Sequence, residues 1–131
     1  MFGLFKSKIK QLPWKENPSK YFKTAGKEEL NAVTESFDND DPKEVDYTTG
    51  IWGHAFNVQD HFENDTGLVH YGYGFYAGAG LIGVRRLKAG DTIIKDTEKK
   101  KKGIYLILHI EYVRDPDDMF WAYIVCIGHK D

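Results

Sequence analysis

The chain has 131 residues, of which 41% are hydrophobic, 15% aromatic and 29% charged, and its formal net charge is −2. This composition excludes a disordered chain, and its single cysteine excludes an intramolecular disulfide. No apolar run approaches the roughly 20 residues of a membrane-spanning helix, and the N-terminus lacks the pattern of a secretory signal. We therefore expect a cytoplasmic protein, or one assembled in a particle, that is neither secreted nor transmembrane.

Charge is distributed unevenly along the chain. Residues 1–30 hold seven Lys and three Glu (+4), residues 31–66 hold nine acidic residues and one Lys (−8), and the remainder holds ten basic and eight acidic residues (+2). Such asymmetry can steer a charged partner, and it says nothing about the fold.

The N-terminal segment MFGLFKSKIKQL has apolar residues at steps of three and four, with lysines between them, and it ends before Pro13. This spacing predicts an amphipathic, basic helix. Such a helix can dock into a partner's groove, lie on an anionic membrane or cover its own domain; of the two outside targets, we expect a protein partner rather than a membrane. The expected partner-binding residues are Phe2, Phe5, Ile9, Leu12 and Trp14.

A second helix is predicted from about Thr24 to Phe37, with Thr24 as its cap and Leu30 and Val33 on its apolar face. The acidic segment FDNDDPKEVDYTTG (37–50) has turn formers and no periodicity, which indicates an exposed linker. Its acids lack the spacing of a calcium loop. We divide the chain into residues 1–48 (basic arm, short helix and acidic linker) and residues 49–131 (antiparallel β domain).

From residue 51 onward the period of the apolar pattern changes to two, which is typical of strands. Two alternating runs flank the turn-like sequence ENDTG and predict a hairpin in which one register makes His61 and His70 neighbours. The pattern predicts a mainly β, β-rich α+β fold: a small antiparallel barrel or sandwich behind an N-terminal helical arm. The six or so expected strands cover about residues 51–59, 68–76, 81–87, 92–95, 103–113 and 119–128.

The last expected strand, MFWAYIVCIG, is apolar on both faces. Its odd-numbered residues, from Met119 to Ile127, are expected to fill the core. Its reverse face carries Phe120, Ile124 and Cys126 and also needs cover, which either the helices or another subunit can supply.

The segment LKAGDTII (87–94) predicts a tight turn, with Gly90 at positive φ and Asp91 bonding back to the turn backbone. It resembles the L-x-x-G-D-x-I turn of many small β-barrels, including the RNA-binding PUA-like group. The resemblance covers about eight residues and implies a barrel-type turn, and no site is carried over from it.

Residues 78–83, GAGLIG, match the glycine spacing of a dinucleotide-binding turn. A cofactor site also needs a following helix to hold the pyrophosphate, and only VRRLKA precedes the next turn. We therefore expect no cofactor, and we interpret the glycines as a bend, a barrel corner or a close approach of backbones.

Metal and catalytic groups are sparse in the sequence. His54, His61 and His70 lie in one predicted hairpin, but alternation places His54 and His61 on opposite faces, so we expect no metal site. Cys126 lies within an apolar strand, where a thiol is inert. The sequence therefore predicts that the protein is not an enzyme and has no catalytic residues.

The most favoured function is that of a non-enzymatic structural or protein-interaction subunit of a larger assembly, such as a viral particle or a bacterial complex. It would bind protein partners or itself through the arm and exposed strand faces. The alternative is a β-barrel nucleic-acid-binding module that combines cations with strand tyrosines; the acidic middle of the chain disfavours it. Its expected contacts are Arg85, Arg86, Lys88, Lys99, Lys100, Lys101 and Lys102, beside Tyr71, Tyr73, Tyr76 and Tyr105.

Overall fold

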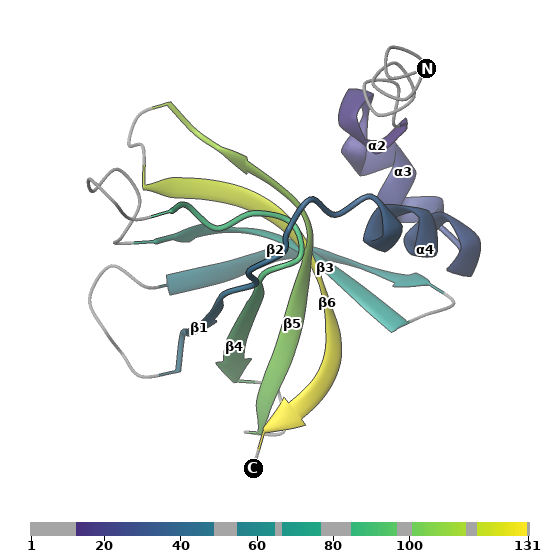
Figure 1. The fold of residues 1–131 in the computed structure, drawn as a ribbon. Helices are drawn as coiled ribbons and strands as arrows, with labels where there is room; N and C mark the ends of the chain where they lie inside the picture. The colour runs from purple at the N-terminus through teal and green to yellow at the C-terminus, as the bar shows by residue number, and fades with distance from the viewer. Residues whose placement is uncertain are drawn as a thin grey trace.

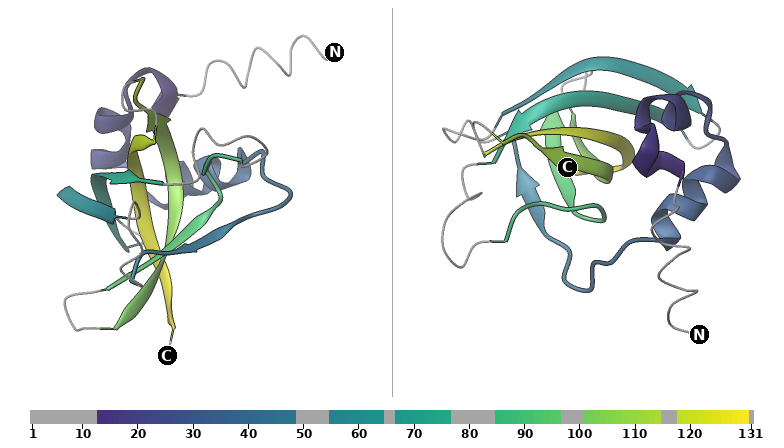
Figure 2. Two further views of the ribbon diagram at one scale, coloured as in Figure 1. Left: turned by 90° about the vertical axis from the view of Figure 1, so that its left-hand side faces the viewer. Right: turned by 90° about the horizontal axis from the view of Figure 1, so that it is seen from above.

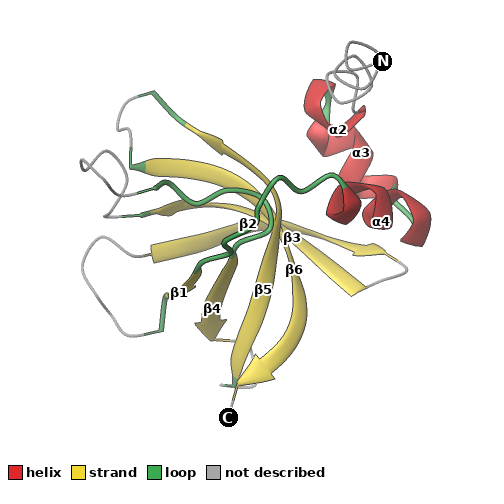
Figure 3. Ribbon diagram, viewed as in Figure 1, coloured by secondary structure: helices red, strands yellow, loops and turns green. Residues whose placement is uncertain are grey.

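The computed structural model describes residues 13–48, 55–64, 67–76, 85–96, 101–114 and 118–130. Within these ranges three short helices precede a six-stranded mixed sheet (Figures 1 and 3), so the mainly β class is confirmed. The helices are α2 (Pro13–Glu16), α3 (Pro18–Thr24) and α4 (Lys27–Glu35). The strands are β1 (Glu44–Asp46), β2 (Ala55–Asn64), β3 (Gly67–Phe75), β4 (Thr92–Asp96), β5 (Lys102–Tyr112) and β6 (Met119–Lys130).

The sheet has the strand order β1-β4-β5-β6-β3-β2. Its pairs are antiparallel except for β1, which lies parallel to β4 with Val45 opposite Ile93. The sheet is mixed and not closed, so the wholly antiparallel barrel or sandwich expected from the sequence was wrong. The parallel pair was not predicted because β1 lies within the segment predicted as an exposed linker. The three residues of β1, two of them acidic, carry too little apolar pattern for a strand to be recognised.

The helical segment also differs from the prediction. Asn17 caps α3, its Oδ1 accepting a hydrogen bond from the Lys20 backbone N–H (3.2 Å), and Thr24 is the last residue of that helix. Gly26 is the N-cap of α4 and has extended backbone. The helix predicted from Thr24 to Phe37 therefore corresponds to α4 with Gly26 as its cap, because the chain leaves helical geometry at Ala25 and Gly26; α3, which ends at Thr24, was not predicted.

Hydrophobic clusters lie on both faces of the curved sheet. We call one the helix-side face: Phe22, Leu30 and Val33 of the helices pack there. Its buried sheet residues are Val69, Leu108, Tyr123 and Val125. The helices gather at one side of the sheet, around one end of the β2–β3 hairpin (Figures 1 and 2). The opposite, inner face buries Tyr76, Leu87, Ile93, Tyr105, Ile107, Phe120, Ala122 and Ile124.

Strand β6 therefore contributes to both clusters. Phe120 and Ile124, on the face predicted to need cover, are completely buried, while Ile127, predicted to fill the core, is 57% exposed. The pairing of β5 with β6 shifts register between Ile104 and Tyr105, and again between Ile107 and His109. The faces change within β5 and not within β6: Leu106 and Leu108 pack with the helix-side cluster, whereas Ile110 and Tyr112 pack with the inner one, which strict alternation cannot anticipate.

Several sequence predictions concern residues outside the described ranges. They include GAGLIG (78–83), the arm residues Phe2 to Leu12, and the first part of the strand expected at 81–87; residues 85–88 are described and form no strand. The β2–β3 hairpin and its His61–His70 pairing are confirmed. No helix in the described part of the chain is long and apolar enough to cross a membrane.

Candidate functional site

The turn before β4 positions the buried carboxylate of the described chain. Gly90 has φ +97°, and the Asp91 Oδ2 atom accepts a hydrogen bond from the Lys88 backbone N–H at 2.8 Å. Gly90 N–H and Ile107 C=O, and Ile107 N–H and Asp91 C=O, pair the turn with β5. The predicted turn, with its positive-φ glycine and its aspartate bonding back, is confirmed.

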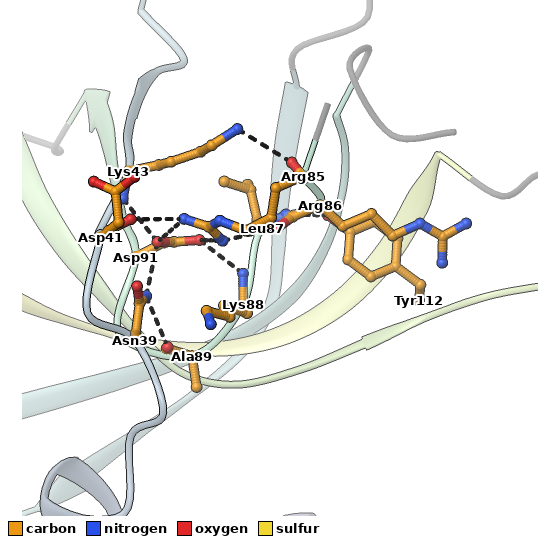
Figure 4. Close-up of polar contacts among 10 residues, drawn as sticks. All are labelled: Asn39, Asp41, Lys43, Arg85, Arg86, Leu87, Lys88, Ala89, Asp91 and Tyr112. Atoms are coloured by element: carbon orange, nitrogen blue, oxygen red, sulfur yellow. Dashed lines mark hydrogen bonds and ion pairs between the residues drawn. The ribbon is translucent and has the colours of Figure 1, made fainter. Parts of the chain in front are cut away.

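Asp91 is fully buried and is surrounded by donors from two segments, residues 85–88 just before it and the distant residues 39–43 (Figure 4). The Arg85 guanidinium donates to both Asp91 oxygens, at 2.9 and 3.0 Å. The backbone N–H of Lys43 and the side-chain amide of Asn39 donate to Oδ1, at 2.8 and 2.9 Å. Burial alone would raise the pKa of Asp91, but these hydrogen bonds outweigh it and hold that pKa below its ordinary value.

The Asp91 network, meaning Asp91 with Asn39, Lys43, Arg85 and Lys88, joins the segment before β1 to the start of β4. Arg85 Nη2 also donates a hydrogen bond to the Asp41 carbonyl oxygen at 3.0 Å, and Lys43 Nζ donates one to the Arg85 carbonyl oxygen at 3.3 Å. Both oxygens of the carboxylate are therefore held by donors of the same chain. This arrangement supports a structural role for Asp91 and Arg85.

The basic residues predicted to contact nucleic acid do not form one patch. Arg85 binds Asp91, and Arg86 lies over the Tyr112 ring at 4.8 Å, near the C-terminal end of β5. Lys101 and Lys102 are exposed at the N-terminal end of the same strand, roughly 30 Å away by the rise per residue of a strand. Lys99 and Lys100 lie outside the described residues.

The tyrosines of that alternative are also separated. Strand β6 lies between β3 and β5, so Tyr71 and Tyr73 are not on a strand adjacent to Tyr105. Tyr71 packs with the helix-side cluster, whereas Tyr76 and Tyr105 belong to the inner cluster. The tyrosines predicted to stack on nucleic-acid bases therefore lie on two different faces of the sheet.

A continuous series of aromatic rings runs across the helix-side face instead. Beneath the helices, Phe22 stacks on Tyr123 with ring centroids 4.6 Å apart, and Tyr123 contacts Tyr71 at 4.5 Å. From there Tyr71 stacks on Trp121 at 5.2 Å, and Trp121 contacts Tyr73, also at 5.2 Å. Tyr73 contacts Phe75 edge-on at 6.3 Å. Phe22 and Tyr123 are buried, while the last four rings are partly exposed.

We call these four rings, Tyr71, Tyr73, Phe75 and Trp121, the aromatic strip. Strand register places Asn57, Tyr73, Trp121 and Glu111 in one row across β2, β3, β6 and β5. In the adjacent row Asp60 is opposite Tyr71. Cross-strand partners share a face, so an exposed carboxylate flanks the strip on either side. Partial burial raises the pKa of Tyr71, and the negative charge of Glu111 raises it further.

The alternating pattern of the strip is present in the sequence, but that pattern alone does not predict the strip. Aromatic residues at 71, 73, 75, 121 and 123 occupy alternate positions of two strands. What the sequence does not contain is the pairing of β3 with β6, which places Tyr73 beside Trp121.

The predicted arm residues Phe2, Phe5, Ile9 and Leu12 lie outside the described residues. Trp14 is described: it is 4% exposed and contacts Tyr21 at 5.3 Å, within the protein's own core. Beside it, a pocket of about 340 Å³ is lined by residues that include Lys15, Ser36, Lys88 and His109.

A second pocket of about 350 Å³ lies between α4 and the sheet and is lined mainly by apolar side chains, among them Leu30, Leu106 and Ile127. The histidines were the other candidates for chemistry. His61 and His70 have ring centroids 6.4 Å apart, and His54 lies outside the described ranges. Among the described residues, no three His, Cys, Asp or Glu side chains are grouped so as to hold a metal ion.

Comparison of the chain with protein-family models, with curated proteins and with solved structures gives no match.

Proposed function

We propose that this protein is a non-enzymatic subunit of a larger cytoplasmic assembly and that it binds another protein molecule through the aromatic strip. The observation that carries the proposal is the row of Tyr73 and Trp121 between Asn57 and Glu111. Here the aromatic series that fills the core under the helices continues onto the surface.

Tyr, Trp and Phe are enriched at protein interfaces because they bury a large apolar area with few rotatable bonds. Trp121 and Tyr73 also carry a polar atom at the edge of the ring, which suits a surface that is exposed to water when free and buried when a partner binds. A polar rim around an apolar centre is the usual anatomy of an interface, and the strip has this arrangement, with Asp60, Asn57 and Glu111 at its margins.

The nucleic-acid alternative has less support. Its arginines are engaged, one by Asp91 and one by Tyr112. Lys88 lies in the Asp91 network, while Lys101 and Lys102 lie at the opposite end of β5. Asp60 and Glu111 beside the strip would repel a phosphate backbone.

The experiment is sedimentation of the full chain over a range of concentrations, compared with the double variant Tyr73→Ser/Trp121→Ser. We expect the unmodified chain to sediment above its monomer mass of 15.1 kDa and the double variant to sediment as a monomer. Far-ultraviolet circular dichroism of the variant would verify that its sheet is retained.

Ile127→Ser is the matched control, because Ile127 is an exposed apolar residue outside the strip. We expect this variant to associate as the unmodified chain does. An unmodified chain that is monomeric at every concentration would contradict self-assembly. If Ile127→Ser weakened self-association as much as the double variant does, the strip would not be the specific contact.

A further inference from the structure

We infer that the aromatic strip receives residues 1–12 of a second copy of this chain, so that two copies exchange their N-terminal segments. This inference rests on the proposed function, because it names the partner of the same surface. Its basis is a match in charge and in residue type between the strip and the segment.

The charges are complementary. Residues 1–12 contain Lys6, Lys8 and Lys10 and no acidic residue. The strip is flanked by Asp60 on β2 and Glu111 on β5, and the Glu111 side chain is 64% exposed. A basic segment across the strip would place ammonium groups between two carboxylates, which favours association.

The protein itself shows how cations pair with rings on this sheet. Lys23 lies 5.8 Å from the Phe62 ring on the helix-side face, and Lys95 lies 5.1 Å from the Tyr105 ring on the inner face. Ammonium groups within about 6 Å of an aromatic face are attracted to it. The lysines of residues 1–12 offer the Tyr73 and Trp121 rings the same interaction.

The apolar residues of the segment fit the strip as well. Phe2, Phe5, Ile9 and Leu12 recur at helical spacing, so an amphipathic helix would present them together. Such a helix of 12 residues is about 18 Å long. It precedes Trp14, which is buried at the helix-covered end of the ring series, away from the strip. Reciprocal exchange between two copies closes a two-fold dimer and leaves no unpaired segment.

The experiment is a charge swap in the full chain, measured by sedimentation at low salt. One variant carries Lys6→Glu, Lys8→Glu and Lys10→Glu; the other carries Asp60→Lys and Glu111→Lys. Each variant alone brings like charges together, and we expect its self-association to be at least about tenfold weaker than that of the unmodified chain. An equimolar mixture restores both attractive contacts and should form a heterodimer.

The control variant Glu28→Lys/Glu35→Lys changes two exposed charges on α4 and should associate as the unmodified chain does. If Tyr73→Ser/Trp121→Ser abolishes association while the lysine variant retains it, the strip binds something other than residues 1–12. The inference then fails and the proposed function stands. If the two charge variants are monomeric and their mixture stays monomeric, exchange between copies is excluded. If the unmodified chain is itself monomeric, the self-assembly on which the inference rests fails with it.

Discussion

The Asp91 network and the aromatic strip are two clusters of side chains that are typical of functional sites, and they differ in what surrounds them. Asp91 is fully buried, and backbone and side-chain donors of the same chain occupy both of its oxygens. The rings of the strip contact one another and remain partly exposed, and its two flanking carboxylates face solvent.

The difference shows why burial and hydrogen bonding matter more than residue type in recognising a site. A buried carboxylate with all of its partners inside the chain stabilises the fold, and removing one partner leaves the others unpaired. Partly exposed aromatic rings with a polar margin still have apolar area to lose to a partner. Substitutions in the first region should therefore act on stability, and those in the second on association.

The largest expected effect is that of Asp91→Asn. The new amide would place an N–H₂ group against donors from Arg85, Lys88 or Lys43, so we expect a loss of about 3 kcal/mol in the free energy of unfolding. Urea denaturation followed by circular dichroism measures it. Asp40→Asn is the control, because Asp40 is exposed and lies between Asn39 and Lys43 in the segment before β1. It should change the free energy of unfolding little. Equal stabilities of the two variants would show that the network does not hold the fold together.

Gly72→Ala comes next and tests whether the strip depends on the close pairing of β2 with β3. A Cβ atom at Gly72 would stand 2.2 Å from the Asn57 carbonyl oxygen and 2.9 Å from the Val58 Cα, at the β-bulge of β2. Because the backbone must move to relieve this overlap, we expect the free energy of unfolding to fall by about 2 kcal/mol and self-association to weaken.

The matched control for this substitution is Gly128→Ala. A Cβ atom there would meet only the Ile104 Cδ1 atom, at an ordinary 3.9 Å. We expect this variant to unfold at nearly the same urea concentration as the unmodified chain. If Gly72→Ala were as stable as the control, the close approach of β2 to β3 would not be a requirement of the fold.

A smaller effect is expected from acid. Because hydrogen bonding holds the pKa of Asp91 below its ordinary value, its contribution to stability is complete above the unfolded pKa of about 3.9. That contribution is lost as the pH falls through the lower folded pKa. The difference in unfolding free energy between the unmodified chain and Asp91→Asn should therefore be constant from pH 7 to about 5 and shrink toward pH 3. A difference that grows in acid would mean that the charged carboxylate is not the favoured form.

The smallest expected effect on stability is that of Tyr73→Ser. Its ring is partly exposed and contacts Trp121 and Phe75, so its removal should cost no more than about 1 kcal/mol. Thermal unfolding of dilute protein, at a concentration where it is monomeric, isolates this term from association. A loss as large as that of Asp91→Asn would place Tyr73 in the core of the fold and undo the contrast between the two regions.

Much of this architecture follows from local pattern. The period-two runs predicted the β2–β3 hairpin and β4 to β6, and LKAGD predicted the Gly90 turn and the bond from Asp91 to Lys88. These features depend on residues close in sequence, where side-chain alternation and glycine's freedom at positive φ are sufficient. The Asn39 and Lys43 contacts to Asp91 could not be predicted in this way, because they join residues 52 and 48 positions apart in the sequence.

By itself, the sequence determined that this chain is mainly β, where most of its strands lie, and that a basic segment precedes an acidic one. Tertiary structure alone decided that β1 pairs parallel to β4, that the sheet stays open, and that Tyr73 lies beside Trp121 between Asn57 and Glu111. The physical reason is that alternation specifies which side chains share a face of one strand. Which strands become neighbours depends on how two hydrophobic clusters are buried at once, and that balance involves the whole chain.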